Sequence, residues 1–430
     1  ATTPTGMPPR RRSPSEPSRT PPPADGSAGP VMPAPFFEPA SRRCLLLHFA
    51  GGLRLDEEGD RIGHVSRRSG LPRLDVHGRR GRVRCRPFAQ SRAVARPVEW
   101  MPMRTQECGA VSSAGTSGPD HTLALELVRV TEAAAIAADR WVGRGARNSG
   151  KAAAIDAMHK LIMPVPMRGV VVIGEGEKKD TPVLFKGECV GDGDGPACDI
   201  GISADDGTLS MAAAAERGAM YDPSPVLHME KLAVGPDYVD VVDISRPVVE
   251  NLRAVATVKG VRVSDVIVAV LNRPRHHELV REIREAGARV HLMEGGDVAG
   301  AIAAACPESQ VDMLWGTGGA AEGVIAAAAL FCMGGSLQAR LRPHGFEQGG
   351  KKPEAGHDAD TVLCTGDLVR GENVLFCATG VTGSELLSGV QHHSGRTTTQ
   401  SLVMCSSPHT MRFVKSEHRQ VARAPRDGFG

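Results

Sequence analysis

The chain has 430 residues, of which 41% are hydrophobic and 23% are charged, a balance typical of a globular protein rather than of a disordered or fibrous one. No apolar run approaches the roughly 20 residues that a membrane-spanning helix needs. The net charge of +2 conceals an asymmetry, because residues 1–118 hold 19 Arg, no Lys and 10 acids, which leaves the remainder acidic. An acidic body suits a metal site better than a nucleic-acid platform, so neither nucleic acid nor a membrane is the expected partner.

The ten cysteines contain no Cys-x-x-Cys pair, which excludes a zinc knuckle and a thioredoxin-type motif. Several of them, including Cys332 and Cys377, lie inside apolar runs. Such cysteines are typical of small buried hydrophobic residues in a reducing compartment. We therefore expect a cytoplasmic location, or an organellar one if the N-terminal region is a transit segment.

Residues 1–40 are rich in Pro, Ser and Arg and carry only three acids, so they cannot bury enough surface to fold. Residues 41–118 remain Arg-rich and show no regular periodicity. Three interpretations stay open for residues 1–118: an organellar transit segment, a basic disordered arm, or an over-long reading of the gene. In each case the region is a low-complexity or disordered Arg/Pro-rich extension outside the folded domain.

Regular elements begin at residue 122. Apolar residues at helical spacing predict a helix over 122–141, and Ile155, Met158 and Ile162 predict one face of a second helix. A strand over 169–173 follows.

Beyond residue 246, helices and strands alternate. The predicted helices are 247–259, 276–286, 297–306 and 321–333, and the predicted strands are 266–271, 289–293, 311–315, 373–378 and 398–404, with a short helix over 384–387. This alternation predicts an α/β fold with a mixed or parallel sheet. We divide the chain into 119–245, a metal-binding half; 246–405, a sugar-phosphate-binding half; and 406–430, a loose tail.

The most informative stretch is 170–208, where two strand-like runs each end in an acidic, glycine-rich loop. The first loop is Gly-Glu-Gly-Glu at 174–177, and the second is Asp-Asp-Gly-Thr at 205–208. Ligands bind at the carboxyl ends of strands in α/β folds. Carboxylates that converge there require a counter-charge, and hard divalent cations that bridge to phosphate supply it. The stretch indicates Mg²⁺- or Mn²⁺-assisted phosphate chemistry; the alternative is a pair of solvated acidic turns.

Eight motifs in a fixed order carry a family resemblance. They are Leu-Val-Arg-Val-Thr-Glu-Ala-Ala-Ala at 127–135, Trp-Val-Gly-Arg-Gly at 141–145, Val-Ile-Gly-Glu-Gly-Glu at 172–177, Met-Glu-Lys-Leu-Ala-Val-Gly-Pro at 229–236, Arg-Pro-Arg-His at 273–276, Gly-Asp-Val-Ala at 296–299, Gly-Gly-Ala-Ala-Glu-Gly at 318–323 and Cys-Ala-Thr-Gly-Val-Thr at 377–382. Over roughly 122–405 the chain resembles the class II fructose-1,6-bisphosphatases, some of which also cleave sedoheptulose 1,7-bisphosphate. The resemblance implies the layered αβαβα fold of the lithium-sensitive sugar phosphatases, a sugar bisphosphate substrate, Mg²⁺ or Mn²⁺ as cofactor and a homo-oligomer.

The resemblance also implies roles for single residues. Glu175, Asp206 and Glu322 would hold metal, and Thr208 would position the attacking water. Either Asp180 or Asp205 would substitute for a missing acid after a small backbone shift. The residues that would bind substrate are Asp206, Gly207, Thr208, His228, Arg273, Arg275, Asp297 and Gly319. Each has a structural alternative: the arginines as surface charges, Asp297 as a helix N-cap and Glu322 as a first-turn partner of the helix dipole.

The chain also departs from the family pattern. Lysines stand at two acidic positions, 151 and 179, and the acid expected near the latter is one residue late, at Asp180. Ser203 and Gly295 replace two further acids, and roughly ten residues are absent between Thr208 and Ala214, which could remove a strand. Two hypotheses follow: a metal-dependent fructose-1,6-bisphosphatase, or a non-catalytic relative that binds sugar phosphates or a partner.

Overall fold

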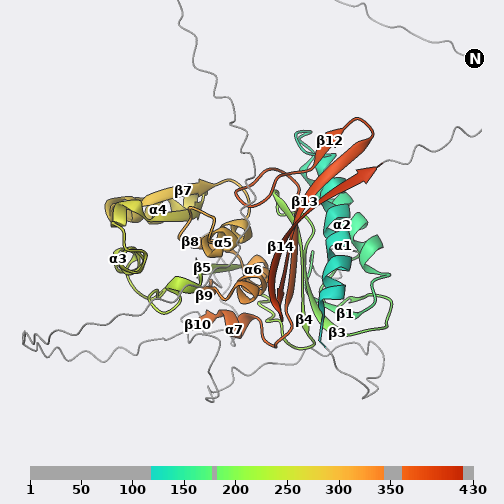
Figure 1. Ribbon diagram of the computed structural model, residues 1–430, viewed down its shortest axis with the longest axis horizontal. Helices are drawn as coiled ribbons and strands as arrows, with labels where there is room; N and C mark the ends of the chain where they lie inside the picture. The colour runs from blue at the N-terminus through green and yellow to red at the C-terminus, as the bar shows by residue number, and fades with distance from the viewer. Residues whose placement is uncertain (1–117, 177–181, 343–360, 420–430) are drawn as a thin grey trace, which may run out of the picture. The chain divides into compact units, whose positions relative to one another are not determined.

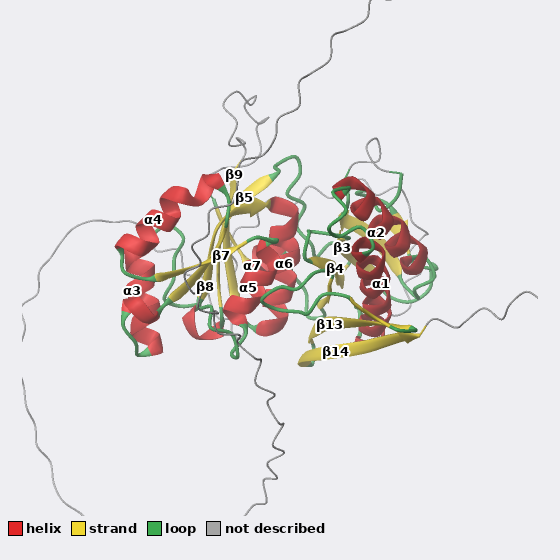
Figure 2. Ribbon diagram, turned by 90° about the horizontal axis from the view of Figure 1, so that it is seen from above, coloured by secondary structure: helices red, strands yellow, loops and turns green. Residues whose placement is uncertain are grey.

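The structure is a computed structural model that describes residues 118–176, 182–342 and 361–419. Its helices and strands form alternating layers in the order helix, sheet, helix, sheet, helix (Figures 1 and 2). This arrangement confirms the predicted αβαβα fold. Of the predicted extension over residues 1–118, only Gly118 is among the described residues. Lys179 and Asp180 also lie outside them.

The first sheet has eight strands in the order β12-β13-β11-β4-β3-β1-β2, with β14 paired to β13. Its strands are β1 (Arg168–Ile173), β2 (Cys189–Val190), β3 (Ala197–Ser203), β4 (Leu209–Glu216), β11 (Leu375–Gly380), β12 (Gln391–His393), β13 (Arg396–Ser406) and β14 (His409–Arg419). The pair β1 and β3 is parallel, and the other pairs are antiparallel. β1 is buried from Gly169 to Ile173, as expected for a strand covered on both faces.

The second sheet has six strands in the order β10-β9-β5-β8-β6-β7. They are β5 (His228–Val234), β6 (Ile267–Leu271), β7 (Arg289–Met293), β8 (Met313–Gly319), β9 (Ser336–Arg342) and β10 (Val362–Cys364). The strands β7, β6 and β8 run parallel, so their carboxyl ends meet at one edge. Sheet membership differs from the predicted halves, because β5 belongs to the second sheet and β11 to β14 return to the first.

Helices cover both sheets. α1 (His121–Asp139) and α2 (Arg147–Ile162) lie on the outer face of the first sheet, and α3 (Val248–Lys259) and α4 (His277–Glu285) lie on the outer face of the second. The middle layer consists of α5 (Asp297–Ala305), α6 (Ala320–Met333) and the short α7 (Thr365–Leu368). Short 3-10 turns occupy Pro236–Tyr238, Val263–Asp265 and Pro274–His276. No helix of the described ranges is long and apolar enough to span a membrane.

The middle helix α6 shows how the sequence dictates this packing. It is apolar all round, because it contacts β9 of the second sheet on one side and β11 and β13 of the first on the other. Leu330 has no exposed surface, and its truncation to Ala would cost about 2–5 kcal/mol. The helix ends at Gly334, whose φ of 70° is left-handed and suits glycine.

Capping and cysteine burial agree with the sequence. The Asp120 carboxylate accepts hydrogen bonds from the backbone N–H groups of Thr122 and Leu123, at 2.9 and 3.2 Å, and so begins α1. Cys332 and Cys377 are buried and free, which confirms their prediction as small core residues.

Three expectations differ from the structure. The short helix over 384–387 was wrong: the Ser384 hydroxyl accepts hydrogen bonds from the N–H groups of Leu386 and Leu387, which stabilises a turn instead. The prediction of a loose tail over 406–430 was wrong for β14, which pairs with β13 along all eleven of its residues. The shortened segment after Thr208 costs the sheet no internal strand, because β4 lies between β3 and β11 and pairs with both.

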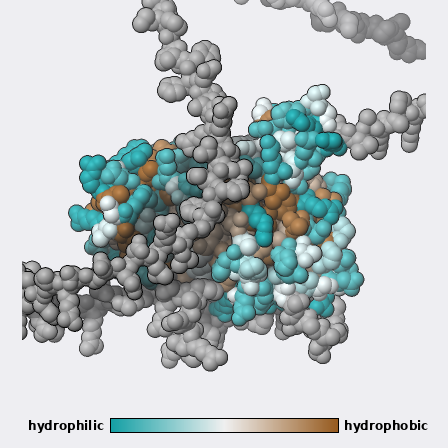
Figure 3. All heavy atoms as spheres, in the orientation of Figure 1, coloured by the Kyte–Doolittle hydropathy of each residue, from teal (hydrophilic) through white to brown (hydrophobic). Residues whose placement is uncertain are grey.

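The exposed edge of the first sheet carries some apolar surface. In Figure 3 hydrophobic residues gather in the middle of the face in view, in the region where Figure 1 places β13 and β14. Met411 and Phe413 of β14 are 41% and 48% exposed.

Candidate active site

Parallel strands bring the predicted site residues to one region. β1 and β3 are parallel neighbours, so Glu175 follows one strand and Asp205 follows the other at the same edge. Two cavities lie there, of about 690 and 250 Å³. Lys151 and Asp205 line both. The larger cavity is also lined by Asp206, Gly207, Thr208 and Arg273, and the smaller one by Glu175, Ser203 and Glu322.

The side chain of Lys151 lines the same cavity as the acidic residues Glu175, Asp205 and Glu322. Its Nζ lies 2.9 Å from Oε2 of Glu175, whose side chain is only 4% exposed. The other oxygen of Glu175 accepts a hydrogen bond from the N–H of Ala204. Burial lowers the pKa of Lys151, but attraction by Glu175, with weaker contributions from Glu322 and Asp205, outweighs burial and raises the pKa above its usual range. The lysine is therefore a permanent cation among these carboxylates.

This arrangement does not fit a divalent ion at Glu175. The ammonium group already neutralises the carboxylate, and a second cation at the same place would be repelled. Within the described ranges, no three or more His, Cys, Asp or Glu side chains are arranged to hold a metal ion. Glu175 and Glu322 come together as predicted, but they do so around a lysine.

Asp206 is turned away from this cluster. Its Oδ1 accepts hydrogen bonds from the N–H groups of Thr208 and Leu209, at 2.8 and 2.6 Å, and from the Thr208 hydroxyl at 3.0 Å. Its Oδ2 is buried and has no hydrogen-bond partner among the described residues. Burial raises the pKa of Asp206 from 3.8 to about 6, although these hydrogen bonds oppose the shift. Asp206 thus lines the larger cavity with Thr208 and does not reach the smaller one.

A loop from the second sheet packs against Asp206. A Cβ placed on Gly296 would lie 2.2 Å from Asp206 Oδ2, and one on Gly295 would lie 2.3 Å from Thr208 Cγ2. The acid that the family carries at position 295 would therefore collide with Thr208 in this chain. The departure at Gly295 is consistent with the close approach of the two loops.

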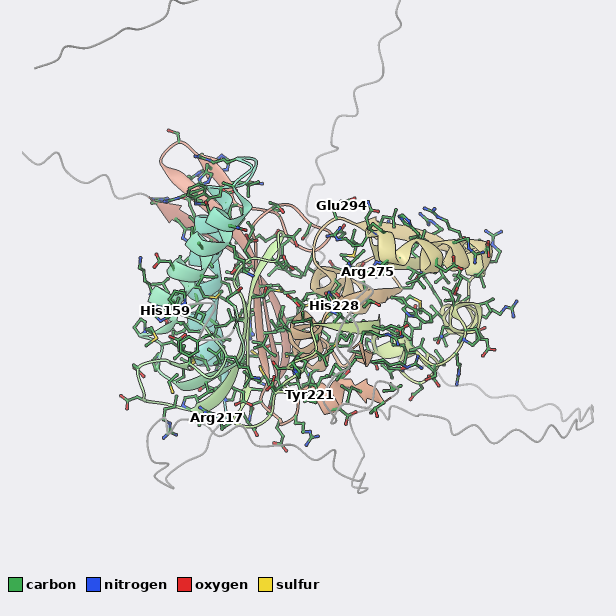
Figure 4. All side chains as sticks on the ribbon, turned by 180° about the vertical axis from the view of Figure 1, so that it is seen from behind. His159, Arg217, Tyr221, His228, Arg275 and Glu294 are labelled. Carbon is green, nitrogen blue, oxygen red and sulfur yellow. The ribbon has the colours of Figure 1, made fainter. Side chains whose placement is uncertain are left out.

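The two arginines hold the loop that follows β6. Arg273 donates hydrogen bonds to the carbonyl oxygens of Asn272 and Glu294, both at 2.8 Å, and Arg275 donates to that of Thr317 at 2.9 Å. Figure 4 labels Glu294, Arg275 and His228, which lie near the middle of the view, between the outer helix layers. Burial and the charge of Arg275 lower the pKa of His228. Only Arg273 of these two arginines lines the larger cavity.

His276, which follows the two arginines, is buried at 3% exposure. Its Nδ1 lies 2.8 Å from the carbonyl oxygen of Leu271, and its Nε2 accepts the N–H of Thr317 at 2.8 Å. Burial lowers its pKa, which favours the neutral imidazole. The ring therefore connects the arginine loop to β8.

Asp297 and Gly319 belong to a buried polar cluster beside this loop. Lys231, 1% exposed, places its Nζ 2.6 Å from Asp297 Oδ2 and donates to the carbonyl oxygen of Gly319 at 2.7 Å. Asp297 is the first residue of α5 and makes no capping hydrogen bond, so the N-cap alternative is wrong. A Cβ on Gly319 would lie 1.8 Å from Glu322 Oε2, so position 319 must be glycine for Glu322 to fold back over it.

Thr382 and Glu294 are among the cavity residues that had no predicted role. The Thr382 hydroxyl donates to the carbonyl oxygen of Gly207 at 3.2 Å, and the N–H of Val381 donates to that of Thr208 at 2.8 Å. Thr382 and Glu294 both line the larger cavity. The motif at 377–382 was the available signal for Thr382, and only the fold shows that it supports the 205–208 loop.

Comparisons with known proteins agree with the resemblance. Residues 121–418 match the family described as bacterial fructose-1,6-bisphosphatase, glpX-encoded. Fructose-1,6-bisphosphatase 1 class 2 of Escherichia coli K12 is 37% identical over 319 residues, which cover 69% of this chain and 95% of the relative. The class 2 fructose-1,6-bisphosphatases of a second Escherichia coli strain and of Shigella flexneri match to the same extent.

Proposed function

Because this chain belongs to the class II fructose-1,6-bisphosphatase family, we propose that it hydrolyses fructose 1,6-bisphosphate to fructose 6-phosphate and inorganic phosphate. In this reaction a water oxygen forms a bond to the phosphorus of the 1-phosphate. The bond between that phosphorus and the sugar oxygen breaks, and the sugar oxygen takes a proton. The chain is thus an enzyme of carbohydrate metabolism, and no finding favours a non-catalytic relative.

The observation that supports this proposal most is the larger cavity. Its volume of about 690 Å³ lies in the range of small-molecule sites. Lys151 and Arg273 contribute positive charge to its wall, and the 206–208 loop contributes the Thr208 hydroxyl. Cationic side chains that surround a phosphoryl group stabilise the charge of its transition state.

Thr208 and Asp206 form the proton path in this proposal. The Thr208 hydroxyl donates to Asp206 Oδ1, so its lone pairs are available to accept a proton from the attacking water. As the water reacts, its proton moves to the Thr208 oxygen, and the Thr208 proton moves to Asp206. The pKa of Asp206, raised by burial to about 6, suits a base that works near neutral pH.

The members of this family are metal-dependent phosphatases, and the choice between Mg²⁺ and Mn²⁺ belongs to the proposal. Carboxylate oxygens suit either ion, but those of Glu175, Asp205 and Glu322 line one cavity with the Lys151 ammonium group. The site at Glu175 does not fit one, and the proton path above requires only side chains of this chain. A homo-oligomer stays a prediction.

Thr208→Val tests the proposal. Valine has nearly the shape of threonine and lacks the hydroxyl, so phosphate release from fructose 1,6-bisphosphate should fall about 100-fold or more, in the range of lost proton-transfer catalysis. Arg281→Met is the matched control, because Arg281 is an exposed residue of α4 that pairs with Glu278 and Glu285. Release that is unchanged in Thr208→Val would contradict the role of this site.

A further inference from the structure

We propose that Lys151 is a tethered cation that takes the place of a divalent metal ion at Glu175 and contacts the substrate phosphate itself. The inference rests on the proposed function only in naming that phosphate as part of a sugar bisphosphate. The cation site and its phosphate contact can be measured without turnover.

The first observation is the ion pair with Glu175. A carboxylate that is 4% exposed requires a partner charge, and the Lys151 ammonium supplies it at 2.9 Å. Asp205 and Glu322 line the same cavity of about 250 Å³ and attract the same ammonium group. One cation thus attracts three carboxylates, which are not themselves arranged to hold a metal ion among the described residues.

The second observation is the position of Lys151 between the two cavities. Its side chain is 50% exposed, and it lines the larger cavity together with Arg273 and Thr208. An ammonium group has three donors, and Glu175 occupies one of them. Among the described residues that line the larger cavity, Lys151 and Arg273 are the cationic ones. A phosphate bound beside Thr208 would therefore meet the remaining donors of Lys151.

The third observation is the sign of the charge at position 151. Lys151 lies in the first turns of α2. An acid at that position would add a fourth negative charge to the cluster and would require a separate cation. The positive charge of Lys151 instead compensates the negative charges of the cluster, so the cluster requires no separate cation.

The test compares the wild-type chain with Lys151→Asp. The number of Mn²⁺ ions bound per chain is measured by titration with detection of free Mn²⁺ by electron paramagnetic resonance. Lys151→Asp should bind one Mn²⁺ more per chain than the wild type. The control is Lys160→Asp, on the same helix, because Lys160 is 67% exposed and pairs with the exposed Asp156. It should bind the same number as the wild type.

A second measurement uses inorganic phosphate in the presence of EDTA, by isothermal titration calorimetry. Lys151→Gln removes the charge and retains much of the length, and it should weaken phosphate binding about 10-fold or more, while Lys160→Gln should not. Equal Mn²⁺ numbers in the wild type and Lys151→Asp, or unchanged phosphate affinity in Lys151→Gln, would overturn the inference. Because neither experiment requires hydrolysis, an inactive wild type that gives both expected results would reject the proposed function alone.

Discussion

Lys231 and Asp297 form a buried ion pair that joins β5 to the first residue of α5. The two side chains are 1% and 7% exposed, and their charged atoms lie 2.6 Å apart. Lys231→Met would remove the cation and leave the Asp297 carboxylate buried without its partner, together with the carbonyl oxygen of Gly319. Breaking a buried ion pair in this way costs about 3–5 kcal/mol of unfolding free energy.

Asp297→Asn and the double variant Lys231→Met/Asp297→Asn test the same ion pair. Asp297→Asn should also destabilise, because it leaves the Lys231 ammonium group buried. The double variant should cost about as much as the worse single variant, since no buried charge remains without a partner. The coupling free energy between the two positions should then be about 2 kcal/mol or more.

The assay is urea unfolding followed by circular dichroism, with the midpoint and the slope fitted for each variant. Lys160→Met is the matched control, because Lys160 and Asp156 are also 2.6 Å apart but are 67% and 65% exposed. Its cost should be at most about 1 kcal/mol. A Lys231→Met variant as stable as Lys160→Met, or additive costs in the double variant, would refute the argument from burial.

Three further predictions concern the site. The raised pKa of Asp206 means that the folded chain binds a proton more tightly than the unfolded chain. The free energy of unfolding should therefore fall by up to about 3 kcal/mol as pH rises from about 4 to above 6. Asp206→Asn should abolish this fall, as measured by urea titrations. The lowered pKa of His276 has the opposite sign, so stability should fall as pH drops below 6.5. His276→Phe should lose that dependence and cost about 1–3 kcal/mol, because the N–H of Thr317 loses its acceptor, whereas Leu271 O keeps the N–H of Arg273. Gly319→Ala should displace Glu322 and reduce phosphate release at least about 10-fold, and an unchanged rate would contradict the close packing at Gly319.

Local sequence patterns were sufficient for the elements with a strong period. The buried strand β6 and the apolar helix α6 appear where the sequence predicts them, because the length and apolar character of each run match one type of buried element. The position of Glu175 at the carboxyl edge of β1 and β3 was equally predictable, because a Gly-Glu sequence directly after a strand places its carboxylate at that edge. The family resemblance added the order of these elements.

Other parts of the fold depend on distant partners. β5 carries Lys231 in its centre, which breaks its apolar pattern. Asp297 and the carbonyl oxygen of Gly319 bind the ammonium group and so stabilise that lysine in the core. β14 is polar and charged, and it forms a strand because β13 offers a complete edge for pairing. These contacts join residues far apart in the chain, and no local pattern encodes them.

The candidate site shows the same division. The sequence indicated that Glu175 and Glu322 would converge and that Lys151 replaced an acid. It did not indicate that Asp206 would turn toward Gly296 while Asp205 faces the lysine, because that choice depends on the packing of loops from two sheets. The roles assigned to these residues remain predictions.

The most direct test of the account is a ³¹P NMR time course of fructose 1,6-bisphosphate with the full chain, in parallel samples that contain EDTA, Mg²⁺ or Mn²⁺. We expect the resonance of the 1-phosphate to disappear as one equivalent of inorganic phosphate and one of fructose 6-phosphate appear. A folded chain that leaves both phosphate resonances unchanged in all three samples would contradict the proposed hydrolysis.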